Sequence, residues 1–552
     1  MNNNVLFYHE IILTDILNSD FIKLLRDKTV SLYTIKKGEF TLKKSKILFL
    51  MLSLTLVLAL TVVLSACATN AITIIDPVTP EEIPVYTNNI PSSEENTHML
   101  FYRPKSGCVA DVIPFWDEGK FRLFYLNGIT SDGAFGCSWF LVSTADFLNF
   151  EEMGVSLAHG GEDDLDLSAI TGSVIKVDDT YHIFYTGHNP ALIPTQLVMH
   201  AVSTDLMNWE KIPEDNFFPN PEKYETGKNN NFRDPFVYYS DDENKYYMLL
   251  SVREKSSPTE SGYTALFSST DLKTWTDEGK FWAPELYHTH ECPDLFKIGD
   301  WWYLVYSEYT GTNMTRYVMS KDLKNWVFPK DDAFDGRAFY AAKSYSNGKN
   351  RYLFGWVPTK VDGNDENRWE WGGSMMVHQI FQRADGTLGV KLPQTINDAW
   401  QSLEKSEEKI TVSNSGGKAS KLLFTALSDA YRIDGTMTFE QGCKEFGITF
   451  GQNYSSKSGG YKYSFHPDEN AVKFDGVTSD IYSKNLSRPI DLLANATVNF
   501  SLLVENQVAV LYINDEIALS TRFHNPLGGD ITIYAVGGEA SMENAVISSF
   551  TS

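Results

Sequence analysis

The feature that most constrains the fold of this chain is a strand-turn-strand unit that recurs five times between residues 98 and 400. Each unit begins with an apolar run, passes through a short turn rich in Asp, Asn, Glu and Gly, and enters a strand dense in aromatic residues. Repeats of roughly 35–60 residues with this internal order are typical of propeller blades. The repeat therefore predicts an all-β chain in which residues 98–400 form a five-bladed β-propeller.

Four of the five units end in a corner with a Ser or Thr, an Asp and a closing aromatic residue, namely Phe150, Trp209, Trp275 and Trp326. Ser and Asp side chains cap turns by bonding nearby backbone groups. We interpret the corners as structural, with the aromatic ring filling space between blades.

A second domain is expected after Trp400. A polar stretch leads to Ile410, and residues 410–552 contain short alternating strands separated by Gly, Asn, Asp and Pro. This pattern is typical of an antiparallel β-sandwich. The sandwich region offers no acidic site of its own.

The first 67 residues resemble a bacterial lipoprotein signal. An uncharged apolar run covers 47–64, lysines precede it, and Leu64-Ser65-Ala66-Cys67 closes it. Cleavage before Cys67 would leave that cysteine as a lipid-carrying amino terminus. The alternative is an uncleaved signal anchor, because the run is long enough to span a bilayer. Both interpretations place the rest of the chain outside the cytoplasm, with residues 68–97 as a tether.

The composition narrows the classes of partner. The formal net charge of -24 would repel the phosphates of nucleic acid, so we expect none as a partner. A neutral oligo- or polysaccharide suits the charge and the aromatic content of 13%. No P-loop or dinucleotide-binding glycine pattern is evident. We expect no cofactor.

The cysteines do not predict a metal site. Besides Cys67 the chain has Cys108, Cys137, Cys292 and Cys443, and none has Cys-x-x-Cys spacing. A bond between Cys108 and Cys137 is conceivable, but four small buried thiols are favoured.

Three acidic motifs occupy corresponding places in separate units. They contain Asp111, Asp234 and Glu291. Retaining glycoside cleavage needs a carboxylate nucleophile and a carboxylic acid on either side of the anomeric carbon. Asp111 is the candidate nucleophile and the longer Glu291 the candidate acid/base. Asp234 follows Arg233, which can hold it ionised or bind the sugar, so that Asp234 stabilises the transition state.

With these motifs the chain resembles glycoside hydrolase family 32, the invertase, levanase and inulinase family, over residues 98–552. NFRDPFVYY and ECPDLF resemble the family's Arg-Asp-Pro and Glu-Cys motifs, which implies transition-state stabilisation by Asp234 and acid/base catalysis by Glu291. ITGSVI is similar to a segment at the sugar pocket, and GRAFYAAKSY and WEWGGSM are similar to later stretches. The substrate-binding residues that follow from the resemblance are Arg233, Thr171, Tyr340 and Trp371.

The first motif departs from the family pattern. Asp111 keeps the nucleophile position, but Ala110 replaces an Asn that helps to hold fructose, and Leu126 replaces a Gln. The function expected is retaining hydrolysis of β-fructosides or fructan-type oligosaccharides. The alternatives are a fructosyltransferase, an arabinan- or xylan-type glycosidase on the same fold, and a non-catalytic glycan-binding lipoprotein.

Overall fold

The computed structural model describes residues 100–550, except residues 129–135, 229, 309–310, 407, 427 and 478–485. The expected signal region (1–67) with Cys67, and the tether (68–97), lie outside the described residues. No helix in the described part is both long and apolar enough to cross a membrane.

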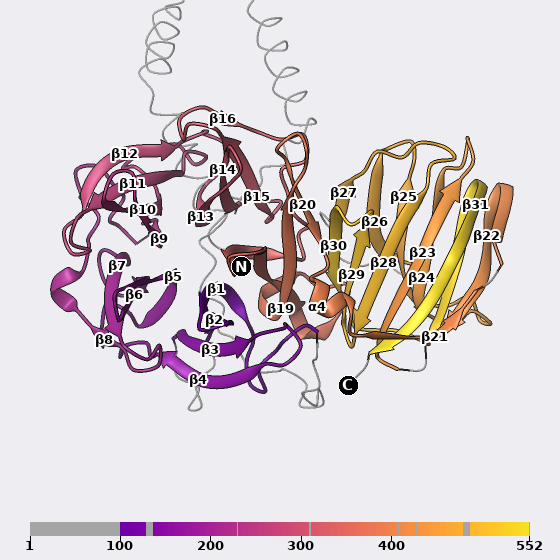
Figure 1. The fold of residues 1–552 in the computed structure, drawn as a ribbon, viewed down its shortest axis with the longest axis horizontal. Helices are drawn as coiled ribbons and strands as arrows, with labels where there is room; N and C mark the ends of the chain where they lie inside the picture. Colours follow the sequence, from indigo (N-terminus) through magenta and orange to yellow (C-terminus); the bar gives the residue numbers. More distant parts are fainter. Residues whose placement is uncertain are drawn as a thin grey trace, which may run out of the picture. The chain divides into compact units, whose positions relative to one another are not determined.

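The first twenty strands form five antiparallel sheets of four strands each, arranged in a ring (Figure 1). The first blade contains β1 (Ala110–Asp117), β2 (Lys120–Asn127), β3 (Ser138–Thr144) and β4 (Glu151–Leu157). The second contains β5 (Ser168–Val177), β6 (Thr180–His188), β7 (Gln196–Ser203) and β8 (Glu210–Lys211). The third contains β9 (Phe232–Ser240), β10 (Lys245–Val252), β11 (Tyr263–Ser269) and β12 (Thr276–Trp282).

The fourth blade contains β13 (His290–Ile298), β14 (Trp301–Glu308), β15 (Thr315–Ser320) and β16 (Trp326–Val327). The fifth contains β17 (Tyr340–Ser346), β18 (Arg351–Lys360), β19 (Trp369–Gln382) and β20 (Leu388–Lys391). Short helical turns occur at η1 (Pro213–Asp215), η2 (Val361–Gly363) and α4 (Gln394–Asn397). Because each blade consists of four consecutive strands, the structure confirms the predicted five-bladed propeller.

The corners act as predicted. In the second blade the Oγ of Ser203 accepts the Leu206 N–H at 3.1 Å, and Oδ1 of Asp205 accepts the Asn208 N–H at 2.8 Å. The ring of Trp209 then lies 6.5 Å from Phe124 of the preceding blade. The corner therefore fixes a turn and supplies an aromatic contact between blades.

The ring closes between the first and fifth blades. Val109, just before β1, forms an antiparallel bridge with Gly373 of β19. The Met375 N–H donates to the Tyr102 carbonyl at 2.8 Å. The segment before β1 therefore lies along the last blade.

Residues 400–550 form the second domain. Its strands are β21 (Trp400–Lys405), β22 (Ile410–Thr425), β23 (Ala430–Phe439), β24 (Glu445–Gln452), β25 (Tyr461–His466), β26 (Ala471–Gly476), β27 (Ser487–Pro489), β28 (Val498–Glu505), β29 (Val508–Ile513), β30 (Ile517–Arg522) and β31 (Asp530–Phe550). The polar stretch after Trp400 contains β21, which pairs with β31.

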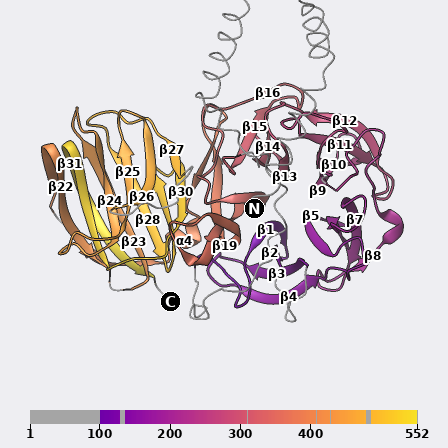
Figure 2. The ribbon, with the colours of Figure 1, turned by 180° about the vertical axis from the view of Figure 1, so that it is seen from behind.

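Two long strands pass from one layer of this domain to the other. The first half of β31 pairs with β24, and its second half pairs with β23. The change of partner occurs at Gly537 and Gly538, and Gly537 has a φ of 68°, which glycine adopts without strain. The strand β22 shifts register at Gly416 and Gly417. These bends give the predicted β-sandwich, as a nearly closed network of eleven strands (Figure 2).

Buried polar contacts join the two domains. Asp335, which lies before β17, accepts hydrogen bonds from the Ser520 N–H at 2.7 Å and from its hydroxyl at 2.5 Å. The guanidinium of Arg522 donates to the Pro358 carbonyl at 2.8 Å. The Glu505 carboxylate accepts the N–H groups of Leu100 and Phe101, each at 3.1 Å. The start of the described chain is therefore bound to β28 of the sandwich.

Candidate active site

The site is built on an irregularity that all five blades share. The first strands of the blades, β1, β5, β9, β13 and β17, contact one another around the centre of the ring. Each loses its regular register with the second strand at the same place in the blade. Such bulges bend a strand and re-aim its side chains, and they are frequent next to active sites.

Four of the bulges contain a non-glycine residue with positive φ. These residues are Asp111 at 37°, Asp234 at 61°, Cys292 at 53° and Ala341 at 50°. L-residues rarely adopt this conformation, although Asp does so more readily than most. Persistent strain at one level of the ring is typical of a functional site.

The bulges align the five blades residue by residue. The residue before each bulge is Ala110, Ile170, Arg233, Glu291 or Tyr340, and the bulged residue is Asp111, Thr171, Asp234, Cys292 or Ala341. Asp111 and Asp234 are therefore equivalent, whereas Glu291 lies one residue earlier, in the position of Arg233 and Tyr340. This corrects the expectation that all three acids occupy the same position.

The Asp111 carboxylate accepts two hydrogen bonds. The Thr171 hydroxyl donates to Oδ2 at 2.5 Å, and the Trp356 indole donates to Oδ1 at 3.1 Å. Burial, and then the charges of Asp234 and Glu291, raise the pKa of Asp111 to about 7, against the effect of these two donors. Asp111 therefore holds its proton to a higher pH than an exposed Asp does.

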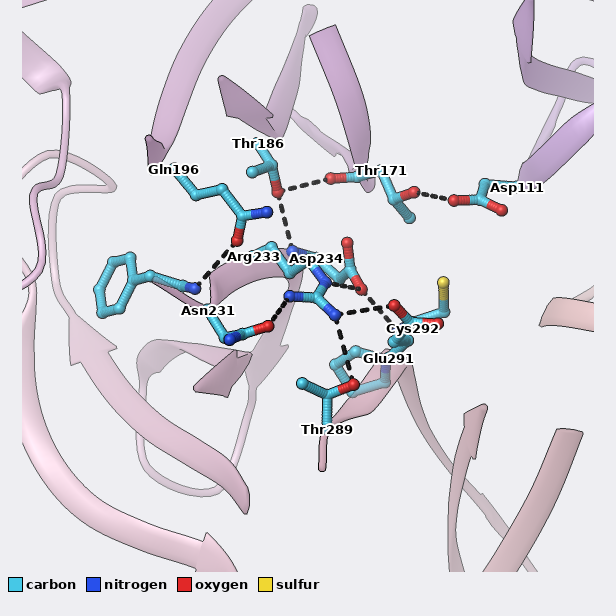
Figure 3. Close-up of polar contacts among 12 residues, drawn as sticks. Asp111, Thr171, Thr186, Gln196, Asn231, Arg233, Asp234, Thr289, Glu291 and Cys292 are labelled. Atoms are coloured by element: carbon cyan, nitrogen blue, oxygen red, sulfur yellow. Dashed lines mark hydrogen bonds and ion pairs between the residues drawn. The ribbon is translucent and has the colours of Figure 1, made fainter. Parts of the chain in front are cut away.

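Asp234 is more deeply buried, with 3% of its surface exposed. Its Oδ2 accepts the Cys292 N–H at 2.9 Å, and its own N–H donates to the Thr186 hydroxyl at 2.8 Å. Burial raises the pKa of Asp234, while the Arg233 guanidinium, 3.8 Å from Oδ2, lowers it. Figure 3 shows this chain of contacts from the second to the fourth blade.

Both oxygens of Glu291 are held by neighbouring blades. Arg233 donates to Oε1 at 2.7 Å, and the Tyr340 hydroxyl donates to Oε2 at 2.6 Å. Arg233 also contacts Thr289 at 3.3 Å and Asn231 (Figure 3). These contacts fix the direction of the Glu291 carboxyl group.

Aromatic side chains surround the acids. The rings of Tyr340 and Trp356 lie 5.6 Å apart, and those of Trp356 and Trp371 lie 6.5 Å apart, both edge to face. Trp371 is partly exposed. The rings therefore supply apolar surface of the kind on which a sugar ring packs.

The residues predicted from the sequence lie together in the structure, but one of them has a different contact from the one expected. Thr171, expected to bind substrate, is 1% exposed and donates to Asp111. Trp356 and Thr186 were missed because only spatial proximity places them at the acids. Their position at the end of a blade's second strand, opposite the bulge, is the signal that could have identified them.

Ala110 and Leu126, the two residues at which the first motif departs from the family pattern, are buried within the first blade. Ala110 is 0% and Leu126 is 1% exposed, and the two residues face each other between β1 and β2. They therefore shape the first blade near Asp111 without presenting a surface of their own.

All four cysteines in the described part of the chain are free. Cys292 and Cys443 are buried as expected, but Cys108 and Cys137 are partly exposed. Four buried thiols were therefore expected and two are found. No group of three or more His, Cys, Asp or Glu among the described residues is placed to hold a metal ion.

The sequence of the propeller matches a known protein family and several characterised proteins. Residues 102–390, more than half of the chain, match the model of the glycosyl hydrolases family 32 N-terminal domain. A sucrose-6-phosphate hydrolase of Escherichia coli is 22% identical over 470 residues, covering 78% of this chain and 90% of that protein. A levanbiose-producing levanase of Bacillus subtilis is 23% identical and covers 80% of this chain and 88% of its own.

Solved structures share the fold. The sucrose-6-phosphate hydrolase of Lactobacillus gasseri superposes with a TM-score of 0.65 at 19% identity, over 84% of this chain and 94% of that one. The exo-inulinase of Aspergillus awamori superposes with a TM-score of 0.66 at 16% identity, over 84% of this chain and 99% of its own.

The raised pKa of Asp111 predicts that Asp111→Asn stabilises the protein above neutral pH. The folded state holds this proton up to about pH 7, whereas an unfolded Asp releases it near pH 4, so ionisation of Asp111 costs folding stability as the pH rises between these values. The amide cannot ionise. We expect a gain of up to about 4 kcal/mol at pH 8, which disappears near pH 4, by thermal or urea unfolding.

Asp271→Asn is the matched control, because it should have the opposite sign. Hydrogen bonds from the corner lower the pKa of Asp271 to about 2, so its carboxylate stabilises the fold above about pH 4 and loses this effect as the pH falls towards 2. A stability difference for Asp111→Asn that does not change with pH would contradict the raised pKa.

Proposed function

Because the chain belongs to glycoside hydrolase family 32, we propose that it is a retaining hydrolase of β-fructosides, with the covalent intermediate on Asp111. The observation that carries the proposal is the pair of bonds from Arg233 and Tyr340 to Glu291, in a site that also contains Asp111 and Asp234. A binding protein does not need a carboxyl group held in one direction beside a second carboxylate. Hydrolysis with retention needs an acid/base carboxyl and a nucleophile carboxylate in one site.

In the proposed first step, an oxygen of Asp111 attacks the anomeric carbon and the bond to the leaving oxygen breaks. Glu291 gives its proton to that oxygen, and a glycosyl ester on Asp111 results. In the second step Glu291 takes a proton from water, whose oxygen attacks the same carbon and releases Asp111. The products are a free sugar with retained configuration and the leaving alcohol.

Asp234 and Thr171 support the two steps. Asp234, fixed by the Cys292 N–H, can bind sugar hydroxyls and, in its ionised form, stabilise the oxocarbenium-like transition state. Thr171 holds Asp111 by its Oδ2, which leaves Trp356 on the other oxygen. Both donors favour the ionised form that attack requires.

The substrate class follows from the relatives. The proteins to which this chain is similar are named as sucrose-6-phosphate hydrolases, levanases, a raffinose invertase and an exo-inulinase. We propose a β-fructoside or a fructan-type oligosaccharide for this chain. Ala110 and Leu126 are buried and do not contact a sugar, so we propose that the loss of the two amides disfavours sucrose through the shape of the first blade near Asp111.

A substrate screen tests the proposal. We expect hydrolysis of at least one of sucrose, inulin, levan and difructose anhydrides at pH 7.5, with sucrose slower than the best substrate. Proton NMR of the first product should show the configuration of the substrate. Release from arabinan alone, with inversion, would favour the arabinan-type alternative, and binding of fructans without any cleavage would favour the glycan-binding one. Transfer products at high sugar concentration would indicate a fructosyltransferase.

The roles of the two carboxyl groups predict different mutant kinetics. Glu291→Gln should lose on the order of 10²–10⁴-fold in kcat on natural fructosides, because the leaving oxygen is no longer protonated. It should lose far less on an aryl β-fructoside, whose phenolate leaves without a proton. Asp111→Asn should lose activity on both. Equal losses of Glu291→Gln on both substrates would rule out Glu291 as the acid.

We also propose that the protein is anchored outside the cytoplasm by lipid on Cys67. The support is the Leu64–Cys67 sequence at the end of the apolar run. Cys67→Ser should move the protein from the membrane fraction to the soluble fraction, measured by fractionation and immunoblotting. Retention of the variant in the membrane as an uncleaved chain would favour the signal anchor.

A further inference from the structure

A cavity of about 630 Å³ lies further along the first strands of the five blades, three of which carry the acids. On each of β1, β5, β9, β13 and β17 the residues that line it follow the bulge in sequence. Two lysines reach this cavity, Lys176 and Lys343. The two ammonium groups differ in their hydrogen-bond partners.

Lys343 is buried, with 3% of its surface exposed. Its Nζ donates to the Pro293 carbonyl at 2.9 Å and lies 5.4 Å from the centre of the Phe236 ring. Within the described part of the chain, Lys343 makes no salt bridge with a carboxylate. A buried ammonium group is costly unless charge balances it, so its partner is expected among the nearby acids.

The contact of Lys343 reaches the active site through one residue. Pro293 directly follows Cys292, whose N–H donates to Asp234 Oδ2 at 2.9 Å. The next residue, Ser344, donates its own N–H to Asp294 at 2.7 Å, so β17 holds β13 at two successive positions. The contacts from the fifth blade therefore hold the backbone next to Cys292, whose N–H donates to Asp234.

We propose that Lys343 is a positioning residue for hydrolysis, which fixes the Cys292–Pro293 bulge and balances the charge of Asp234 from the side away from the substrate. The inference rests on the proposed function. It adds a cation that touches neither substrate nor the reacting atoms.

The charged and titratable groups around Asp234 come from four strands. They are Arg233 on its own strand, Glu291 and Cys292 on β13, Lys343 on β17 and Asp111 on β1. Arg233 and Lys343 lower the pKa of Asp234, and Glu291 raises it. Loss of Lys343 should therefore raise the pKa of Asp234 and move the pH at which Asp234 becomes ionised upward.

Three substitutions separate charge from hydrogen bonding. Lys343→Arg keeps the charge and a donor, Lys343→Gln keeps a donor alone, and Lys343→Met keeps neither at a similar length. The quantity to measure is the acidic limb of the kcat/KM profile on the fructoside that wild type cleaves fastest. Lys176→Met is the matched control, because the Lys176 ammonium lies in the same cavity but is held by Asp117 at 3.3 Å and Tyr181 at 2.9 Å.

We expect the limb to move to higher pH by about one unit in the Gln and Met variants, and to stay in place in the Arg and Lys176→Met variants. At a pH one unit below the acidic limb of wild type, the ratio of variant to wild-type kcat/KM should then be about tenfold smaller than the same ratio at pH 8. If Lys343 only supports the fold, the Gln and Met variants would lose activity equally at every pH, and that result overturns the inference. A variant that does not fold is recognised by its unfolding curve, and the Gln variant then decides. A wild type without fructosidase activity would instead refute the proposed function.

Discussion

The active site depends on one backbone constraint, the bulge that interrupts the first strand of every blade at the same level. A regular strand would send consecutive side chains to opposite faces, so that Asp111 and Ala110, or Glu291 and Cys292, would alternate without meeting their neighbours across the ring. The positive φ at Asp111, Asp234 and Cys292 changes that direction. It also frees the Cys292 N–H from the ladder, and this N–H then bonds Asp234. The strain is sustained because five packed blades hold it in place.

The electrostatics of the site follow from bringing three carboxyl groups to these bulges. Burial and mutual repulsion raise the pKa of Asp111, and opposing contacts limit the rise: Thr171 and Trp356 at Asp111, and Arg233 at Asp234. Thr171 and Trp356 come from other blades than Asp111, whereas Arg233 precedes Asp234 on the same strand. Ionisation in the centre is therefore set by how the blades fit together, and a change in blade packing reaches the chemistry through these contacts.

Much of this was accessible from the sequence. The repeated unit and its corners predicted five blades, since the Ser and Asp bonds are local and recur with the motif. The three acids were also predicted from the repeat, because their motifs occupy corresponding places in separate units. The sequence did not predict that Glu291 lies one residue before the position of Asp111 and Asp234, because the composition of a strand does not show where a bulge adds a residue. The partners Trp356 and Thr186 were also missed, since they come from second strands that the sequence marks only as buried and aromatic. Contacts of this kind depend on tertiary packing.

The bond between Glu505 and the backbone of Leu100 and Phe101 has a consequence for synthesis on the ribosome. The first blade leaves the ribosome long before β19, which its leading segment must pair with, and before β28, which carries the carboxylate. Until then that segment has no partner along its edge, and the loop that its closure spans is nearly the whole molecule. The ring is thus completed late and from its two ends. A chain that ends before Glu505 would keep the pairing of Val109 with β19 but would lose the bonds to Leu100 and Phe101, together with the last strands of the sandwich.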